Sequence, residues 1–190
     1  MIVAENVSAE SISLQEFERV AAEYPDLRLE LTREGELVIM APAGGETGNW
    51  NADLTADLVI WNRAAKTGRV FDSSTGFVLP NGAERSPDAS WVELRRWEAL
   101  SLEERKKFLP LCPDFVIELR SISDRLSSVQ RKMQEYKENG ARLGWLIDPI
   151  SKQVEIYRPG QDVEILNHPL SVSGEAVLPG FLMDLKGILE

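Results

Sequence analysis

Asp114-Phe115-Val116-Ile117-Glu118-Leu119-Arg120 is the stretch that decides the fold. Its apolar run, Phe115 to Ile117, is typical of a central strand that is buried on both faces of a sheet. Glu118 follows directly, at a place where an unpaired charge is costly to bury. The stretch therefore predicts the middle of a sheet and, at its end, a position with a functional role.

A second apolar run, Leu143 to Ile147, indicates another buried strand. Between the two runs lies an amphipathic segment that extends to about Asn139. We expect it to be a helix, with Asp124 or Ser127 as its N-cap and Gly140 just past its end. Strand, helix and strand in this order predict a parallel crossover.

The N-terminal part of the chain predicts a helix and a hairpin. Ser13-Leu14-Gln15-Glu16 fits a capping box, which indicates a helix from about Ser13 to Tyr24. Leu27–Thr32 and Glu36–Ala41 then alternate apolar and polar residues on either side of Glu34-Gly35. This pattern is typical of a β-hairpin.

The remaining segments fit a mixed α/β protein. Gly44-Gly45 is expected to open a loop before a helix with apolar residues at Leu54, Leu58 and Trp61, ending near Gly68. Further expected elements are strands at Arg69–Ser73, Gly76–Leu79 and Asp88–Val92, a helical excursion at Leu94–Leu109, and a last hairpin of Gln153–Arg158 and Val163–Leu166. No repeat or long linker interrupts them, so we expect a single domain over residues 1–190.

Composition places the chain among cytoplasmic globular proteins. Hydrophobic residues make up 43% and charged residues 27% of it, which is ordinary for such proteins. No apolar run reaches the roughly 18 residues of a membrane span, so no membrane partner is expected. Met1–Glu10 lacks the basic and apolar regions of a signal peptide. Cys112 is the single cysteine and permits no internal disulfide, which suits a reducing compartment.

The charge balance bears on nucleic-acid binding. The formal net charge is -10, and this argues against DNA as a partner because phosphate contacts need lysine and arginine. The charge is uneven, however, since residues 121–159 hold seven bases and five acids. The middle of the chain can therefore present a locally positive face. His168, the single histidine, excludes nucleases built on paired histidines and leaves zinc without its usual ligands.

Two carboxylates on separate strands point to metal chemistry. Asp88 stands at the start of one predicted strand and Glu118 at the end of another. Carboxylates that meet on one side of a sheet repel each other unless a cation lies between them. Mg²⁺ (or Mn²⁺) is the expected occupant, because Mg²⁺ takes oxygen ligands and keeps several waters. A nearby lysine can orient or deprotonate a water, while the metal stabilises charge on a phosphate.

The residues around these carboxylates resemble a known family. Pro87-Asp88 with Glu118-x-Arg120 is similar to the PD-(D/E)xK nuclease signature. Longer stretches resemble a large bacterial family within that superfamily, the putative restriction endonuclease family. They are Arg28–Leu31, Gly35–Leu37, Asp72–Phe77, Arg85–Trp91, Cys112–Ser121 and Lys132–Tyr136. The resemblance extends from about Leu14 to Leu185.

The resemblance implies a restriction-endonuclease-like α/β fold, with a mixed sheet flanked by helices and with an added N-terminal helix and hairpins. It implies a metal-dependent endonuclease that hydrolyses DNA, and it suggests a homodimer. The implied catalytic residues are Glu30, Asp88, Glu118 and Lys132, with Asp88 and Glu118 as metal ligands and the lysine moved onto the helix after the strand. Arg120 stands at the usual lysine position. Arginine stays protonated, so we expect it to bind substrate phosphate rather than activate water.

Helical geometry supports Lys132 separately. Leu126, Val129, Met133 and Tyr136 define the apolar face of the predicted helix. Lys132 lies on the flank of that face, where it can bury its stem and direct its ammonium group along the sheet.

Each candidate also has a structural alternative. Asp88 could be a strand-start residue, Glu118 a strand-end residue in solvent, Glu30 a solvent-side strand residue, and Lys132 a solvated helix lysine. Two further classes of function stay open. One is a nuclease-fold protein that no longer cuts and only binds nucleic acid or a protein partner. The other is a metal-dependent hydrolase of a smaller phosphoester.

Overall fold

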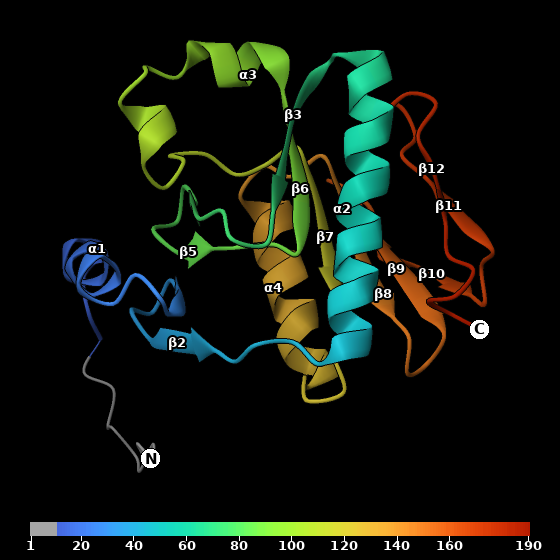
Figure 1. Ribbon diagram of the computed structural model, residues 1–190, viewed down its shortest axis with the longest axis horizontal. Coiled ribbons are helices and arrows are strands. Elements are labelled where there is room, and N and C mark those ends of the chain that lie inside the picture. Colours follow the sequence, from blue (N-terminus) through green and yellow to red (C-terminus); the bar gives the residue numbers. More distant parts are fainter. Residues whose placement is uncertain (1–10) are drawn as a thin grey trace.

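A six-stranded mixed sheet forms the centre of the computed structural model, which describes residues 11–190 (Figure 1). Its middle strand, β7 (Phe115–Leu119), is buried along its whole length, as predicted. β7 pairs in parallel with β8 and antiparallel with β6. The strand order is β10 (Glu164–Asn167), β9 (Gln153–Tyr157), β8 (Leu143–Asp148), β7, β6 (Ala89–Glu93) and β3 (Gly68–Asp72).

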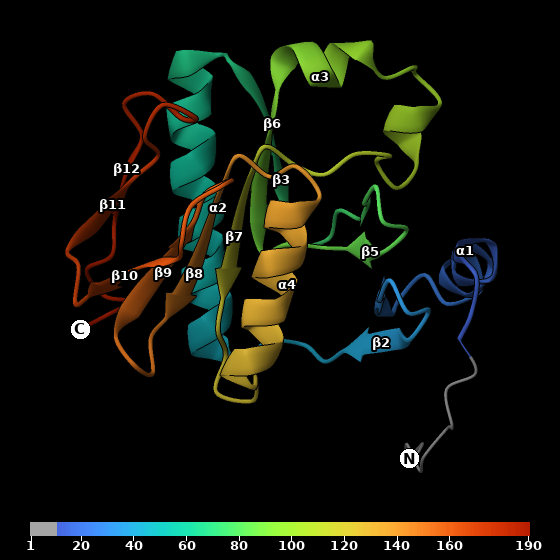
Figure 2. The same ribbon diagram turned by 180° about the vertical axis from the view of Figure 1, so that it is seen from behind.

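Two helices cover opposite faces of this sheet (Figures 1 and 2). α2 (Gly45–Ala65) packs Leu54 and Leu58 against one face of the sheet. The residues of β7 on that face, including Ile117, belong to the same hydrophobic core. α4 (Leu126–Glu138) packs Met133 and Tyr136 against the alternate residues of the same strands. α4 also provides the predicted parallel crossover between β7 and β8.

A smaller sheet carries the N-terminal hairpin. Its order is β2 (Leu37–Met40), β1 (Arg28–Leu31), β5 (Glu84–Arg85) and β4 (Phe77–Val78). α1 (Leu14–Glu23) begins with the predicted capping box of Ser13 and Glu16 and buries Phe17 against β1. The expected N-terminal helix and hairpin are thus confirmed. The expected last hairpin is confirmed too, because β9 and β10 pair antiparallel in the central sheet. β11 (Ser171–Ser173) and β12 (Leu182–Asp184) form a separate pair near the C-terminus.

Three local predictions were wrong. Gly44-Gly45 does not open a loop, because α2 already begins at Gly45; its first turns are polar and so show no apolar period. Leu94–Leu109 is not one helix, since α3 (Leu94–Ala99) ends and a 3₁₀ turn at Glu104–Lys106 follows. α4 has neither predicted N-cap, although Gly140 does follow its C-cap, Asn139, with a positive φ as expected. Its N-cap is Arg125, while the Asp124 carboxylate accepts hydrogen bonds from Ser121 instead.

The first ten residues and the domain organisation of the whole chain stay untested. Met1–Glu10, on which the signal-peptide argument depends, lies outside the described residues. Within residues 11–190, every helix is too short or too polar to cross a membrane. That the whole chain forms a single domain stays a prediction.

Candidate active site

Four elements bring the predicted site residues to one edge of the central sheet. β1 carries Glu30, β7 carries Glu118, and α4 carries Lys132. Asp88 directly precedes β6, in which Ala89 lies opposite Ile117 of β7. One further step along this antiparallel register sets Asp88 opposite Glu118, and residues opposite each other point to the same face. The register of β6 and β7 is therefore compatible with the predicted convergence of the two carboxylates.

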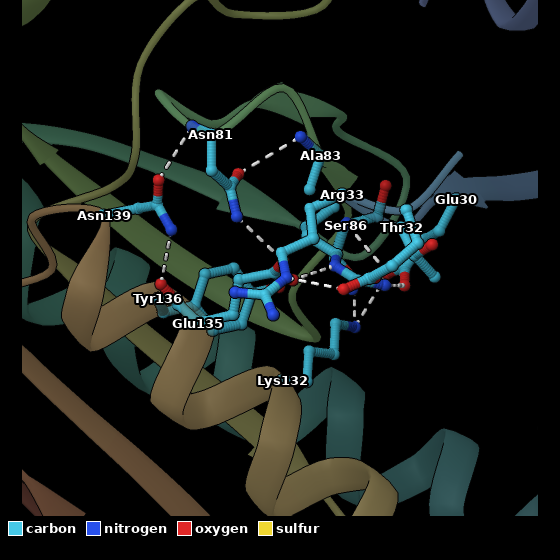
Figure 3. A network of polar contacts seen from close by, with 12 residues as sticks. Glu30, Thr32, Arg33, Asn81, Ala83, Ser86, Lys132, Glu135, Tyr136 and Asn139 are labelled. Carbon is cyan, nitrogen blue, oxygen red and sulfur yellow. Dashed lines mark hydrogen bonds and ion pairs between the residues drawn. The ribbon is translucent and has the colours of Figure 1, made fainter. Parts of the chain in front are cut away.

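Lys132 lies between two of these carboxylates. Its Nζ atom is 2.7 Å from Glu30 Oε1 and 2.8 Å from Glu118 Oε1. It also donates to the Ser86 carbonyl at 3.3 Å. An ammonium group has three donors, so all three are engaged. Figure 3 shows the side chain rising from α4 toward Glu30 and Ser86. Glu30, Asp88 and Glu118 are called the acidic cluster, and the lysine is buried against it. The alternative interpretation of Lys132 as a solvated helix residue is therefore excluded.

Glu118 is buried and is held from α4. Tyr136 donates its hydroxyl to Glu118 Oε1 at 2.9 Å, so Lys132 and Tyr136 both contact the same oxygen. Oε2 is thereby left for another partner. Glu118 does not reach into solvent as an ordinary strand-end residue would, since only 6% of it is exposed.

Asp88 is fixed from two sides. Its Oδ2 accepts the backbone N–H of Leu119 at 2.8 Å, which ties it to the residue after Glu118. Its Oδ1 accepts a hydrogen bond from the Asn51 side chain at 3.2 Å. Asn51 belongs to α2, on the other side of the sheet from α4. The carboxylate is therefore oriented before any ligand arrives.

The acidic cluster perturbs its own ionisation. Burial raises the pKa of Glu118 to about 8, and the negative charges of Asp88 and Glu30 add to this against the opposing effect of Lys132. Burial likewise raises the pKa of Asp88. For Lys132, burial would lower the pKa, but Glu118 and Glu30 outweigh it and raise the pKa above its ordinary value. Lys132 is consequently a charged ammonium group and is unsuited to accept a proton in this arrangement.

A second ion pair extends the cluster. Arg85 contacts Glu30 Oε2 at 3.2 Å and Glu135 Oε2 at 2.6 Å. With Asp88 and Glu118, four carboxylates then face the two cations Arg85 and Lys132. If all six groups are ionised, the cluster carries a net charge of -2. Such a deficit in a shielded site favours either protonation of a carboxyl group or the binding of a divalent cation.

The donor set fits a hard divalent cation with few protein ligands. Within residues 11–190, no group of three or more Asp, Glu, His or Cys side chains is arranged to hold a metal. Glu30 is already neutralised by Lys132 and Arg85. Asp88 and Glu118 then remain as the two carboxylates for an ion that retains most of its waters, which is the habit of Mg²⁺.

Arg120 is not brought into this cluster. Its Nη1 pairs with Asp148 Oδ2 at 2.9 Å and its Nε donates to the Asp124 carbonyl at 3.3 Å. The arginine thus connects the turn after β7 to the end of β8. Its expected contact with a substrate phosphate stays a prediction.

Sequence reasoning missed several participants. Arg85 lies within one of the family-like stretches, and Tyr136 was recognised only as a member of the apolar helix face. Asn51 offered no local signal, because it precedes the apolar positions of its helix. Hydrogen bonds between elements define all three roles, and such contacts leave no periodic trace in the sequence.

Glu84 is a buried carboxyl group behind the cluster. It is fully buried in β5, and neither of its oxygens has a hydrogen-bond partner within residues 11–190. A β-carbon at position 76 would lie only 2.1 Å from Glu84 Oε1. The Glu84 carboxyl group therefore fits because residue 76 is glycine. Burial raises the pKa of Glu84 to about 8, and the charge of Glu30 adds to the shift. The group is therefore a neutral acid at neutral pH.

This protonation predicts a pH-dependent stability. An unfolded Glu84 releases its proton near pH 4.5, whereas the folded one keeps it until about pH 8. Above pH 4.5 the unfolded state binds fewer protons, so stability falls with rising pH over this window. Glu84→Gln removes the effect. The difference in the free energy of unfolding between Glu84→Gln and the wild type should therefore increase, in favour of the variant, by at most about 1.4 kcal/mol for each unit of rising pH. Urea unfolding at pH 5, 6, 7 and 8 measures this difference. The exposed Glu18→Gln is the control, and parallel pH curves for Glu84→Gln and wild type would contradict the assignment.

Comparison with known proteins agrees with the geometry. The mixed sheet flanked by helices is a restriction-endonuclease-like α/β fold. The family model Uma2, described as "Putative restriction endonuclease", matches residues 14–186, and the chain belongs to this family.

A solved structure supports the same fold. The crystal structure of a "putative nuclease belonging to DUF820" from Anabaena variabilis superposes with a TM-score of 0.77 at 21% identity, covering 94% of this chain and 97% of that one. At this identity the likeness shows the fold alone. Among curated proteins, none matches the sequence significantly.

Proposed function

We propose that this protein is a Mg²⁺-dependent (or Mn²⁺-dependent) endonuclease that hydrolyses phosphodiester bonds in DNA. The observation that carries the proposal is the strand register that sets Asp88 opposite Glu118, together with the ion pair between Glu118 and Lys132. The net negative charge of this cluster favours a divalent cation. Membership of a restriction endonuclease family supports a nuclease reaction.

In the proposed reaction, Asp88 and Glu118 are the residues that would hold the metal ion. A bound Mg²⁺ would polarise the phosphate and lower the pKa of a water molecule. Lys132 stays protonated and would stabilise negative charge, and it would orient that water or the phosphate by exchanging its longest hydrogen bond, the one to the Ser86 carbonyl at 3.3 Å. Glu30 would fix the position of Lys132 through their 2.7 Å ion pair.

Arg120 is proposed to contact a substrate phosphate. Its guanidinium group uses two hydrogen bonds within the protein, and arginine has five N–H donors. The remaining donors are available to an anion near the end of β7. The contact would position the substrate and would not activate water.

The experiment that tests the proposed function compares substrates. Purified protein with Mg²⁺ or Mn²⁺ is expected to nick or cut plasmid DNA, and chelation of the metal should stop the reaction. Single-stranded DNA, RNA and a chromogenic phosphodiester are tested in parallel. Cleavage of the small ester without cleavage of any nucleic acid would replace DNA with a smaller phosphoester as the substrate class.

A catalytically inactive binding protein is the second candidate function. The observation in its favour is that Lys132 already neutralises part of the acidic cluster, while the whole chain has a net charge of -10. This candidate predicts metal-independent binding of nucleic acid or a protein partner that Glu118→Gln leaves unchanged. Binding that requires Mg²⁺ would contradict it.

A further inference from the structure

Asn51 forms a hydrogen bond to a candidate metal ligand from α2. Within residues 11–190, no other side chain of α2 does so. Asn51 Nδ2 donates to Asp88 Oδ1 at 3.2 Å. α2 covers the face of the sheet opposite to α4, so the acidic edge receives side chains from both layers. Asp88 is thus held between the backbone of β7 and the amide of a helix that the sequence did not link to the site.

The other end of the same amide is unsatisfied. Asn51 Oδ1 is buried and has no hydrogen-bond partner among the described residues. A buried acceptor without a partner costs about 1–3 kcal/mol, and such atoms in a native protein call for an explanation. Turning the amide over would not remove the problem, because the oxygen would then face the Asp88 carboxylate, which only accepts hydrogen bonds when ionised.

A cation at Asp88 and Glu118 would satisfy this oxygen. Side-chain carboxamide oxygens are regular ligands of hard divalent cations. The oxygen belongs to the same planar amide as the nitrogen that contacts Asp88, so both atoms of the group are fixed by one hydrogen bond to a candidate ligand. Asp88 and Glu118 alone provide few protein ligands, and a neutral third oxygen would add a ligand without adding to the repulsion between the two carboxylates.

We propose that Asn51 supplies a third protein oxygen, Oδ1, to the divalent cation site of Asp88 and Glu118. The inference rests on the proposed function, because it requires that this site takes a metal ion. The hydrogen bond from Nδ2 to Asp88 then has a second role, since it orients the amide so that Oδ1 is presented to the ion. Asn51 would be a metal ligand contributed by the helical layer on the opposite side of the sheet.

Metal binding is measured directly, without the cleavage reaction. Mn²⁺ is titrated into the full-length protein, and free Mn²⁺ is followed by electron paramagnetic resonance. Asn51→Ala should weaken Mn²⁺ binding by at least about 10- to 100-fold, the range for removal of a group that only orients a metal ligand. Asn51→Asp keeps an oxygen at the position but loses the hydrogen bond to Asp88, and it should bind Mn²⁺ more tightly than Asn51→Ala does. Thermal unfolding of each variant confirms that the fold is retained.

A matched control lies on the same helix. Asn49 is exposed and donates to Asp53 at 2.9 Å, one helical turn further along. Asn49→Ala should leave Mn²⁺ affinity unchanged. The two ways to fail are distinct. If the wild type binds no Mn²⁺, the proposed function and this inference both fall. If the wild type binds Mn²⁺ and Asn51→Ala binds it within twofold, or Asn51→Asp is weakened as much as Asn51→Ala, the ligand role of Asn51 is overturned while the proposed function stands.

Discussion

Replacing Glu118 by glutamine is expected to reduce the rate of DNA cleavage by about 10²- to 10³-fold, the scale on which loss of a preorganised charge-stabilising group acts. Glutamine keeps the size of the side chain and can still accept hydrogen bonds from Lys132 and Tyr136. It removes the negative charge that would hold the metal ion. Single-turnover cleavage of a labelled duplex in Mg²⁺ measures the effect, and circular dichroism verifies the fold.

The sheet offers a closely matched control for this change. Glu155 in β9 is buried, receives a hydrogen bond from a tyrosine, and contacts α4 through Gln130 at 2.6 Å. Leu146 lies opposite it and is also the neighbour of Glu118 in the sheet. Glu155→Gln should therefore keep cleavage near the wild-type rate. Asp88→Ala should abolish cutting as Glu118→Gln does, and robust cutting by either site variant would discard the assignment of the metal ligands.

Lys132→Met should destabilise the protein strongly as well as inactivate it. The ammonium group is the shared partner of Glu30 and Glu118, both buried. Removing one member of a buried ion pair leaves an uncompensated charge and costs about 3–5 kcal/mol. Methionine preserves most of the apolar stem, so lost packing contributes little. Urea unfolding at pH 7 gives the change in the free energy of unfolding.

Two further variants isolate the electrostatic origin of this loss. Arg131→Met changes the neighbouring, exposed residue of α4 and should alter stability by less than about 0.5 kcal/mol, as exposed substitutions usually do. Adding Glu30→Gln to Lys132→Met removes the charge left without its partner on Glu30 and should restore part of the stability. A Lys132→Met protein as stable as the Arg131→Met protein would show that the buried ion pair has little effect.

Local patterns were enough for most elements of the fold. The unbroken burial of β7 follows from a run of apolar residues, and α1 follows from a capping box whose two hydrogen bonds form within four residues. Both signals are local, because side-chain periodicity and caps are read from neighbouring residues. Where the local pattern was weak, as in the polar first turns of α2, the prediction failed.

The candidate site divides in the same way. Glu118 could be named from the sequence because a carboxylate directly after a buried apolar run is costly without a partner, whereas Asp88 was named mainly from the family resemblance. The assignment of Lys132 relied on its flanking position on a helix and on the family resemblance. None of these signals indicated that Lys132 would contact Glu30 of a separate sheet, or that Arg120 would turn away to Asp148.

The sequence by itself therefore determined which segments are buried, where the helices and strands lie, and which acidic residues end beside the core. Only the tertiary structure decided which charges meet. The pairing of Lys132 with both Glu30 and Glu118, and the contact of Asn51 with Asp88, depend on how two sheets and two helical layers assemble. The physical reason is that an ion pair or hydrogen bond acts over a few ångströms in space, whereas its partners are separated by long stretches of chain whose packing is a property of the whole fold.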